Sequence, residues 1–290
     1  MGPCHVVEIT TPNRFVLYGL WFGPIETKRV IVWVHGMFSS AFSMQHIIGL
    51  LIDKETAILT FNNRGHETVS EVKRIIGRRR KWIRAGTSHE IFTDCVDDID
   101  GAMRFVKKIG AQEIFLAGHS TGSQKIVYWT GKQKGKGVKG LILLAPLSDF
   151  AGVTRKKQYP SALRLAKDMI RKGRRHTLLP PHAWWHYVDA QRFISLSTPE
   201  SIEQSIFSYF DSRRPSRMLG SVKIPMLVIL AGKDEYADRP AKEIIRWFER
   251  HSRAPIESLV AKGATHSFKN SKVLVAETIK RWISFRGLTT

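Results

Sequence analysis

The segment 118–122, with the sequence GHSTG, has the residue types and spacing of a turn that presents a nucleophilic serine. It fits the pattern G-x-S-x-G, and it lies between a strand-like apolar run and a helix-like segment. In such a unit, glycines permit the tight turn and the close packing that lift the serine hydroxyl out of the sheet. We therefore predict that Ser120 is a catalytic nucleophile.

A serine nucleophile needs a histidine base and a carboxylate that orients the imidazole. His266 follows the last strand-like run, and Asp234 is the first carboxylate after the run before it. Both come after Ser120 in the order serine, acid, histidine that is typical of G-x-S-x-G nucleophiles. We predict a triad of Ser120, Asp234 and His266. Asp149 is the alternative acid, because it follows the preceding strand-like run.

The oxyanion formed by acyl transfer needs N–H donors that are already in place. A glycine turn with the sequence HGMF, at 35–38, follows the third strand-like run. We predict that the main-chain amides of Met37 and Thr121 form a two-donor oxyanion hole. We expect the substrate to be bound by His35, Phe38, His119, Trp184 and Trp185.

The elements that must position these residues are predicted by hydrophobic periodicity. Eight short apolar runs are present, and from the third onward they alternate with segments of helical periodicity. This alternation predicts a mostly parallel α/β sheet of about eight strands with helices on both faces. The first two runs, 6–10 and 15–21, predict an antiparallel edge pair. One helix is predicted from near Thr93 to a glycine stop at Gly110.

Two long segments interrupt the alternation, and loops of such length are typical of lids and binding loops. Residues 66–92 are predicted to be a connection, and 151–217 an inserted helical cap with aromatic and basic residues. The core would then comprise 1–150 and 218–290. Because both interruptions follow strand ends at the carboxyl edge of the sheet, we expect them to surround the pocket entrance.

Composition limits the class of protein. With 290 residues, 43% of them hydrophobic, the chain can form one domain with an insertion. The two cysteines form neither a disulfide framework nor a zinc pattern. The start of the sequence lacks the features of a signal peptide, and no apolar run approaches the ~20 residues of a membrane span. These features predict a cytoplasmic protein without a transmembrane segment.

The net charge of +21 would attract nucleic acid, anionic membranes or anionic small molecules. The segment 72–84 has seven basic residues and no acid, and 151–217 has thirteen basic and five acidic residues. The two segments therefore supply +15 of the charge. Four consecutive basic residues beside Trp82 would suit phosphate contact and base stacking. Since no recognisable nucleic-acid-binding motif accompanies them, we predict no obligate nucleic-acid partner.

The ordered motifs HGMFSS, FNNRGHE, AGHSTG, ILAGKDEY and KGATHSF resemble the α/β-hydrolase superfamily across essentially the whole chain. The resemblance implies a Ser-Asp-His triad, no cofactor, no metal and a cap at 151–217. Haloalkane dehalogenases and epoxide hydrolases resemble the same fold, but they carry aspartate where Ser120 stands. The sequence departs from the frequent D-x-R-G-x-G turn, although Arg64 and Gly65 remain, so we expect the turn to persist. AGHSTGSQ with AGKDEY is similar to a branch that includes fungal siderophore esterases.

The sequence thus predicts a serine hydrolase that cleaves small-molecule carboxylic esters, with a preference for anionic ones if the basic segments surround the entrance. Amidase or thioesterase chemistry and a non-hydrolytic ligand receptor are alternatives on the same fold. A basic nucleic-acid-binding protein is the alternative from a different class. The sequence makes no prediction of oligomeric state.

Overall fold

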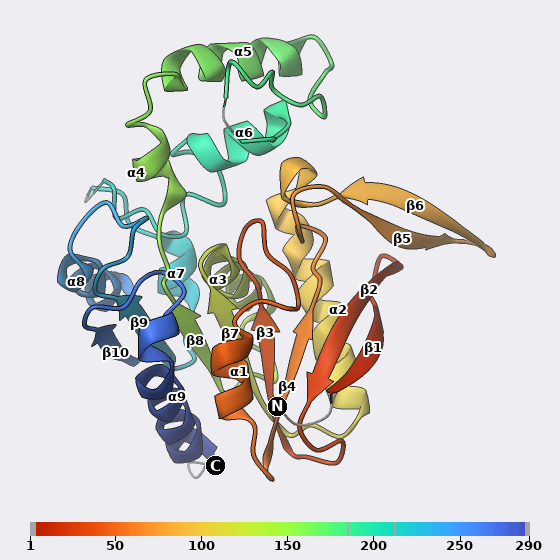
Figure 1. Ribbon diagram of the computed structural model, residues 1–290, viewed down its shortest axis with the longest axis vertical. Coiled ribbons are helices and arrows are strands. Elements are labelled where there is room, and N and C mark those ends of the chain that lie inside the picture. The colour runs from red at the N-terminus through yellow and green to blue at the C-terminus, as the bar shows by residue number, and fades with distance from the viewer. Residues whose placement is uncertain (1–3, 185, 212, 288–290) are drawn as a thin grey trace.

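The computed structural model describes residues 4–184, 186–211 and 213–287. In this part of the chain, ten strands form one sheet (Figure 1). The strands are β1 (Cys4–Thr10), β2 (Phe15–Phe22), β3 (Arg29–Val34), β4 (Thr56–Phe61), β5 (Ser70–Ile76), β6 (Arg79–Ala85), β7 (Glu113–His119), β8 (Gly140–Leu144), β9 (Met226–Ala231) and β10 (Ile256–Ala261).

The strand order is β10-β9-β8-β7-β3-β4-β2-β5-β6, and β1 pairs with β2 off this path. The six strands from β10 to β4 are parallel, whereas the pairs that involve β1, β2, β5 and β6 are antiparallel. Strands β4, β8 and β9 are buried at every residue, as expected for parallel strands that are covered on both faces. The prediction of a mostly parallel sheet with helices on both faces is confirmed.

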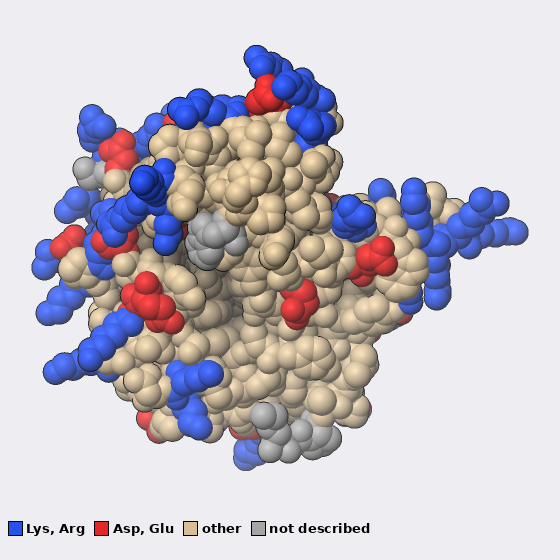
Figure 2. Space-filling view, turned by 45° about the horizontal axis from the view of Figure 1, so that its top comes forward, with Lys and Arg blue, Asp and Glu red and all other residues tan. Residues whose placement is uncertain are grey.

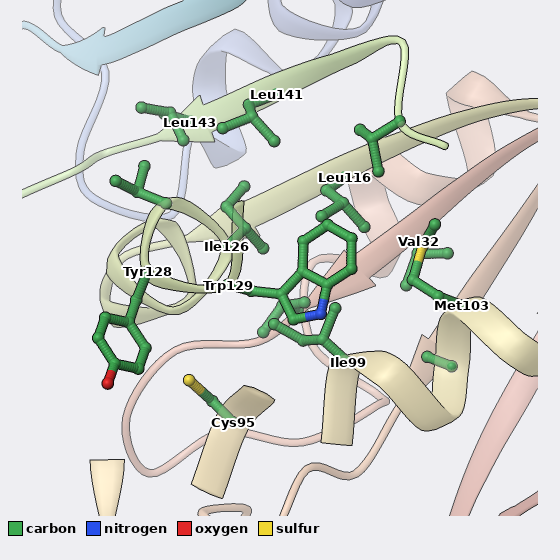
Figure 3. Close-up of a cluster of buried hydrophobic side chains, with 14 of the residues drawn as sticks. Val32, Cys95, Ile99, Met103, Leu116, Ile126, Tyr128, Trp129, Leu141 and Leu143 are labelled. Carbon is green, nitrogen blue, oxygen red and sulfur yellow. The ribbon is translucent and has the colours of Figure 1, made fainter. Parts of the chain in front are cut away.

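Helices cover both faces of the sheet. Helices α1 and α9 pack on one face through side chains such as Ile48 and Ile279. Helices α2, α3 and α8 pack on the other, where Trp129 and Ile99 meet in the cluster of Figure 3. The helices are α1 (Gln45–Leu51), α2 (Cys95–Lys108), α3 (Thr121–Gln133), α4 (Asp149–Val153), α5 (Tyr159–Arg171), α6 (Ala190–Ser197), α7 (Arg217–Ser221), α8 (Ala241–His251) and α9 (Lys272–Gly287), with short 3₁₀ turns at Thr87–His89, Phe92–Asp94 and Lys269–Ser271.

The local predictions at the start of the chain and along α2 agree closely with the structure. β1 and β2 are antiparallel, although only β1 is an edge strand, because β2 also pairs with β4 and β5. Helix α2 begins at Cys95, directly after a 3₁₀ turn, and ends at Lys108. Gly110, two residues later, has a φ of 95°, as expected for a glycine that stops a helix. The turn after β4 persists, since the His66 amide bonds the Asn63 carbonyl at 2.9 Å.

The prediction of a long connection over 66–92 is wrong, because its basic part forms the hairpin β5–β6. A two-residue turn containing Gly77, with a φ of 60°, joins the strands, as tight hairpins require. The hairpin continues the sheet by pairing with the start of β2, where Arg74 lies over the Phe15 ring at 5.1 Å. The hairpin therefore projects from the sheet as an arm of its own (Figure 1).

The cap segment, residues 151–217, lies above the carboxyl edge of the sheet (Figure 1). One face of α5 packs on α6 through Ala162, Ala166 and Phe193, in a hydrophobic cluster separate from those of the sheet. The later residues Ile206 and Phe207 instead belong to the core cluster. The boundary at 217 therefore stays a prediction. No helix in the described ranges has both the length and the apolar character needed to span a membrane.

Candidate active site

The turn after β7 holds Ser120 in an unusual backbone conformation. Ser120 has a φ of 55° and a ψ of −126°, which places it in a region that non-glycine residues rarely occupy. The turn is possible because Gly118 and Gly122 lack a Cβ. A Cβ on Gly122 would lie 2.2 Å from the Val34 carbonyl oxygen, and a Cβ on Gly118 would lie 2.5 Å from the Gly122 backbone. Both glycines are thus required by close backbone approach. Ser120 lies between the carboxyl end of β7 and the first residue of α3.

His266 and Asp234 form a hydrogen-bonded pair at the ends of β10 and β9. The His266 Nδ1 lies 2.8 Å from Asp234 Oδ2, and the side chains are only 13% and 2% exposed. Because a carboxylate only accepts, Nδ1 carries the proton and Nε2 remains available as a base. The Tyr236 amide donates to Asp234 Oδ1 at 3.0 Å and holds the carboxylate in this orientation.

Ser120 and His266 line the same cavity, which has a volume of about 790 Å³. The alternative acid, Asp149, also lines this cavity, but the Nδ1 of His266 faces Asp234. The structure therefore pairs His266 with Asp234 and places Ser120 and His266 on the wall of one cavity, whereas Asp149 makes no hydrogen bond to His266 among the described residues.

The two predicted oxyanion donors lie on either side of Ser120. The turn after β3 touches the serine, since a Cβ on Gly36 would lie 2.9 Å from the Ser120 Cβ. In this turn the Phe38 amide donates to Thr87 Oγ1 at 2.8 Å, which leaves the Met37 amide as the candidate donor. Thr121 is the first residue of α3, so its amide has no acceptor within the helix.

Three of the predicted pocket residues line the cavity, namely Phe38, His119 and Trp184. The Phe38 ring lies 4.9 Å from that of His186, at the junction with the cap segment. Trp184 packs edge-on against Phe193 at 4.9 Å. Trp185 lies outside the described residues.

His119 faces the base directly. Its Nε2 lies 2.9 Å from the His266 carbonyl oxygen, and the rings are 4.8 Å apart. Burial, with the charge of His266 in addition, lowers the pKa of His119 to about 4. His119 is therefore neutral at pH 7, donates to this carbonyl and positions the loop that carries His266.

The expectation that His35 binds substrate is not supported, because its side chain is not among the residues that line the cavity. It is 1% exposed, and its Nδ1 bonds the neighbouring Gly36 carbonyl at 2.8 Å. Burial, followed by the charge of Lys125, lowers the pKa of His35 to about 3. A histidine at the end of a buried strand is enclosed by the surrounding side chains, which hydrophobic periodicity alone does not reveal.

Sequence reasoning assigned no role to the two residues that follow the acid. The His266 amide donates to Glu235 Oε2 at 2.9 Å, and the Tyr236 ring lies edge-on to the imidazole at 4.9 Å. Glu235 therefore binds the backbone of His266, and Tyr236 contacts its ring. Their position directly after Asp234 is the signal that could have identified them.

A buried ionic network joins the cap segment to the nucleophile helix. The Lys125 ammonium lies 2.5 Å from Glu90 Oε1, and the Arg192 guanidinium lies 2.8 Å from Glu90 Oε2. Arg192 also pairs with Glu203. Burial alone would raise the pKa of Glu90, but Lys125 and Arg192 outweigh it and lower that pKa. All four side chains are buried, and each positive charge lies beside a negative one. Buried ion pairs therefore connect the cap segment to helix α3.

Two further features bear on the chemistry of the site. The cavity is lined by the basic side chains of Arg155 and Lys156 and by acidic ones from the core, and no lining residue comes from the hairpin. The described ranges hold no group of three His, Cys, Asp or Glu side chains that could bind a metal ion.

Solved structures with the same architecture include three enzymes or complexes of low sequence identity. DcsB in complex with a substrate analogue has a TM-score of 0.71 and 15% identity, over 98% of this chain and 99% of that chain. Est1E from Butyrivibrio proteoclasticus with bound ferulic acid has a TM-score of 0.64 and 15% identity, over 97% and 98%. The Pyrococcus furiosus esterase Pf2001 has a TM-score of 0.61 and 19% identity, over 97% and 91%. The chain therefore has the α/β-hydrolase fold that its motifs resemble.

No curated protein matches the sequence. A family model described as protein of unknown function (DUF1749) matches residues 86–285, which include the nucleophile turn, the cap segment and the loops of Asp234 and His266. The chain belongs to this family, and the matched range of this chain includes Ser120, Asp234 and His266.

Proposed function

We propose that the protein is a serine hydrolase that cleaves carboxylic esters of small molecules. The observation that carries the proposal is the 2.8 Å hydrogen bond between Asp234 and His266, beside a cavity that Ser120 lines from a turn with a φ of 55°. Pf2001 from Pyrococcus furiosus, one of the similar structures, is called an esterase.

In the proposed reaction, His266 removes the proton from Ser120 as the serine oxygen attacks the ester carbonyl carbon. The Met37 and Thr121 amides hold the resulting oxyanion, and each donor would lower the barrier by roughly 3 kcal/mol. The imidazolium then gives its proton to the leaving alcohol as the ester C–O bond breaks. Water, activated by the same histidine, hydrolyses the acyl-enzyme and regenerates Ser120. Asp234 stabilises the imidazolium in both steps.

The test of this function is the hydrolysis of p-nitrophenyl esters by the Ser120→Ala variant. We expect kcat to fall by roughly 10⁵–10⁶-fold, because the variant has no nucleophile. A fluorophosphonate probe should label the wild type at Ser120. Ser39→Ala is the matched control, since it removes another hydroxyl from the same cavity and should keep activity and labelling. Undiminished hydrolysis by Ser120→Ala would exclude the proposed nucleophile.

We also propose that the basic cap segment steers anionic esters to the cavity. Lys and Arg side chains gather along the margin of the cap and on the hairpin arm (Figure 2), and Arg155 and Lys156 line the cavity itself. Such a field accelerates association with anions and is screened by salt. The hairpin charges, which sequence reasoning placed at the entrance, lie on the arm and line no part of the cavity.

Salt dependence tests the steering. For an anionic ester, kcat/KM should fall several-fold from low to high ionic strength, and for a neutral ester of equal length it should stay constant. Neutralising Arg164 and Lys167 on α5 should weaken the salt dependence, whereas the matched pair Arg79 and Arg80 on the hairpin should leave it unchanged. Equal salt insensitivity of both esters would contradict the proposal.

A further inference from the structure

The wall of the cavity holds a carboxylate that the proposed chemistry does not use. Asp149 is the first residue of α4, just after β8, and it lines the same cavity as Ser120 and His266. Its Oδ2 is shielded from solvent and has no hydrogen-bond partner among the described residues. A buried polar atom without a partner is destabilising, so such an atom requires an explanation.

The backbone around Asp149 is fixed by hydrogen bonds on either side of the residue. The Ser148 amide donates to the Tyr209 hydroxyl at 2.6 Å, and the Phe150 amide donates to Gln204 Oε1 at 3.1 Å. These bonds secure the residue on either side of Asp149. The backbone of Asp149 is therefore held at the cavity wall.

No cation in the described surroundings is dedicated to this carboxylate. Arg192 is near enough to act on it, but its guanidinium pairs with Glu90 and Glu203. The Gln204 side chain is near enough to lower the pKa of Asp149, but its Nε2, like Asp149 Oδ2, has no hydrogen-bond partner among the described residues. Burial, with the negative charge of Glu203 in addition, raises the pKa of Asp149 to about 6. At neutral pH the group is thus mostly an ionised acceptor that lacks a donor.

We propose that Asp149 is a specificity-determining residue, whose carboxylate accepts a hydrogen bond from a hydroxyl group of the ester that Ser120 attacks. This inference rests on the proposed ester hydrolysis. The rest of the wall is largely apolar, with Leu147, Val153 and Phe193 among its residues, so the fitting substrate has an apolar body and a hydroxyl group. A cavity of about 790 Å³ is of the size that binds such a molecule.

A hydroxyl suits this position better than an ammonium group. Arg155 and Lys156 line the same cavity and offset its other acidic residues, Glu235 and Asp238, so the surroundings of Asp149 do not favour a cation. A carboxylate on the substrate would in turn be repelled by Asp149. Steering of anionic esters by the cap therefore concerns approach, whereas Asp149 selects the group that is bound against the wall.

The experiment compares pairs of esters that differ by a single hydroxyl. One series consists of p-nitrophenyl esters of unbranched acids of six to twelve carbons, with a terminal methyl or a terminal hydroxyl group. The other consists of acetates of matched alkanols and alkanediols. The measured quantity is the preference ratio, defined as kcat/KM for the hydroxylated ester divided by kcat/KM for its partner. A third member with a terminal ammonium distinguishes hydroxyl selection from selection of any donor.

In the wild type, at least one series should show a preference ratio that Asp149→Leu lowers by about tenfold or more, because a site built to bond a hydroxyl discriminates strongly. Asp149→Asn, which keeps an acceptor oxygen, should lower the ratio less. Val153→Ala is the matched control, since it changes the same wall without removing an acceptor. It should change both members of a pair equally and leave the ratio unchanged.

The pH dependence of the preference ratio separates recognition from a structural role. A pH effect on the reaction steps that both esters share changes kcat/KM for both members of a pair equally and cancels in the ratio. The ratio should still fall at least about threefold from pH 7.5 to 5, because Asp149 becomes protonated as the pH falls through its pKa. The charged and titratable groups that act on Asp149 are Glu203, Arg192, His266 and Tyr209.

Three results would overturn the proposal: a ratio unaffected by Asp149→Leu in both series, a ratio independent of pH, or a larger preference for the ammonium ester. Loss of hydrolysis of the unsubstituted esters in both Asp149 variants would also overturn it, because Asp149 would then act in the reaction itself. Fluorophosphonate labelling of Ser120 in each variant shows whether the proposed nucleophile is intact. Failure of the proposed function is thus distinguishable from failure of this inference.

Discussion

The nucleophile turn and the cap segment differ in what fixes their positions. At the turn, Ser120 is held by backbone sterics, since neither Gly118 nor Gly122 has space for a Cβ. The cap is attached through buried charges, with Glu90 between Lys125 of the nucleophile helix and Arg192 of α6. Sterics at the turn act within a few consecutive residues, whereas the ionic network joins residues far apart in the sequence. The turn is therefore recognisable as a motif, and the attachment of the cap is not.

Among the variants that test this comparison, the largest effect is expected at Asp234, the acid that pairs with His266. Asp234→Asn should lower kcat for an unsubstituted ester by about 10⁴-fold, because the amide favours the wrong tautomer of His266 and does not stabilise the imidazolium. Asp149→Asn, on the cap side, should change the same kcat less than tenfold. Steady-state kinetics on both variants measures the contrast. The reverse ranking would make Asp149 the triad acid.

The ionic attachment of the cap should contribute strongly to stability. Glu90→Gln leaves Lys125 and Arg192 with less compensation inside the protein, and we expect a loss of about 3–5 kcal/mol in the free energy of unfolding. Denaturant unfolding measures it. Asp168→Asn removes the exposed ion pairs with Arg171 and Lys172 on α5 and should leave the transition essentially unchanged. Similar effects of the two variants would contradict the role of the buried network.

The space around Gly122 in the nucleophile turn can be compared with the space around Gly152 in the cap segment. Gly122→Ala would bring a Cβ to 2.2 Å from the Val34 carbonyl oxygen and should cost roughly 2–4 kcal/mol of stability, together with activity. Gly152→Ala, in α4, has nothing within 4 Å of its Cβ, and its stability should stay constant or rise by up to about 1 kcal/mol. Thermal unfolding distinguishes the two. A stable, active Gly122→Ala variant would remove the steric argument.

The last comparison concerns the pH dependence of the free energy of unfolding, to which His119 and Asp149 should contribute with opposite signs. The folded pKa of His119 is lowered to about 4 from 6.5, so between these values the unfolded chain binds a proton that the folded chain excludes. Stability then falls as the pH is lowered, by about 1.4 kcal/mol per pH unit. The folded pKa of Asp149 is raised to about 6 from 3.8, so its contribution rises as the pH is lowered through this window.

Single variants separate these contributions. Relative to the wild type, His119→Gln should lose less stability between pH 6.5 and 4, because Gln can donate to the His266 carbonyl without titrating. Asp149→Asn should lose more stability over the same range. Unfolding free energies measured at several pH values check both differences. Parallel profiles of the wild type and the two variants would show that neither group has a shifted pKa in the folded state.

The residues of the candidate site differ in how far the sequence could locate them. Ser120, Asp234 and His266 each follow a strand-like run of the parallel sheet, and the carboxyl ends of parallel strands meet at one edge. Glu235 and Tyr236 lie in the same loop as Asp234, but their contacts with His266 depend on how that loop folds back. The enclosure of His35 depends on side chains from several elements and is not encoded in its neighbours.

The sequence by itself determined the order of the eight predicted strands, the turn that carries Ser120 and the loops that carry Asp234 and His266. These features follow from hydrophobic periodicity and from local glycine sterics, which act over a few residues. Only the tertiary structure decided that the basic segment 72–84 is a hairpin beside β2, that Lys125 is buried against Glu90, and that Asp149 faces the cavity without a donor. Strand pairing, compensation of buried charge and the satisfaction of hydrogen bonds depend on partners that are distant in the chain. Spacing along the sequence carries no record of them.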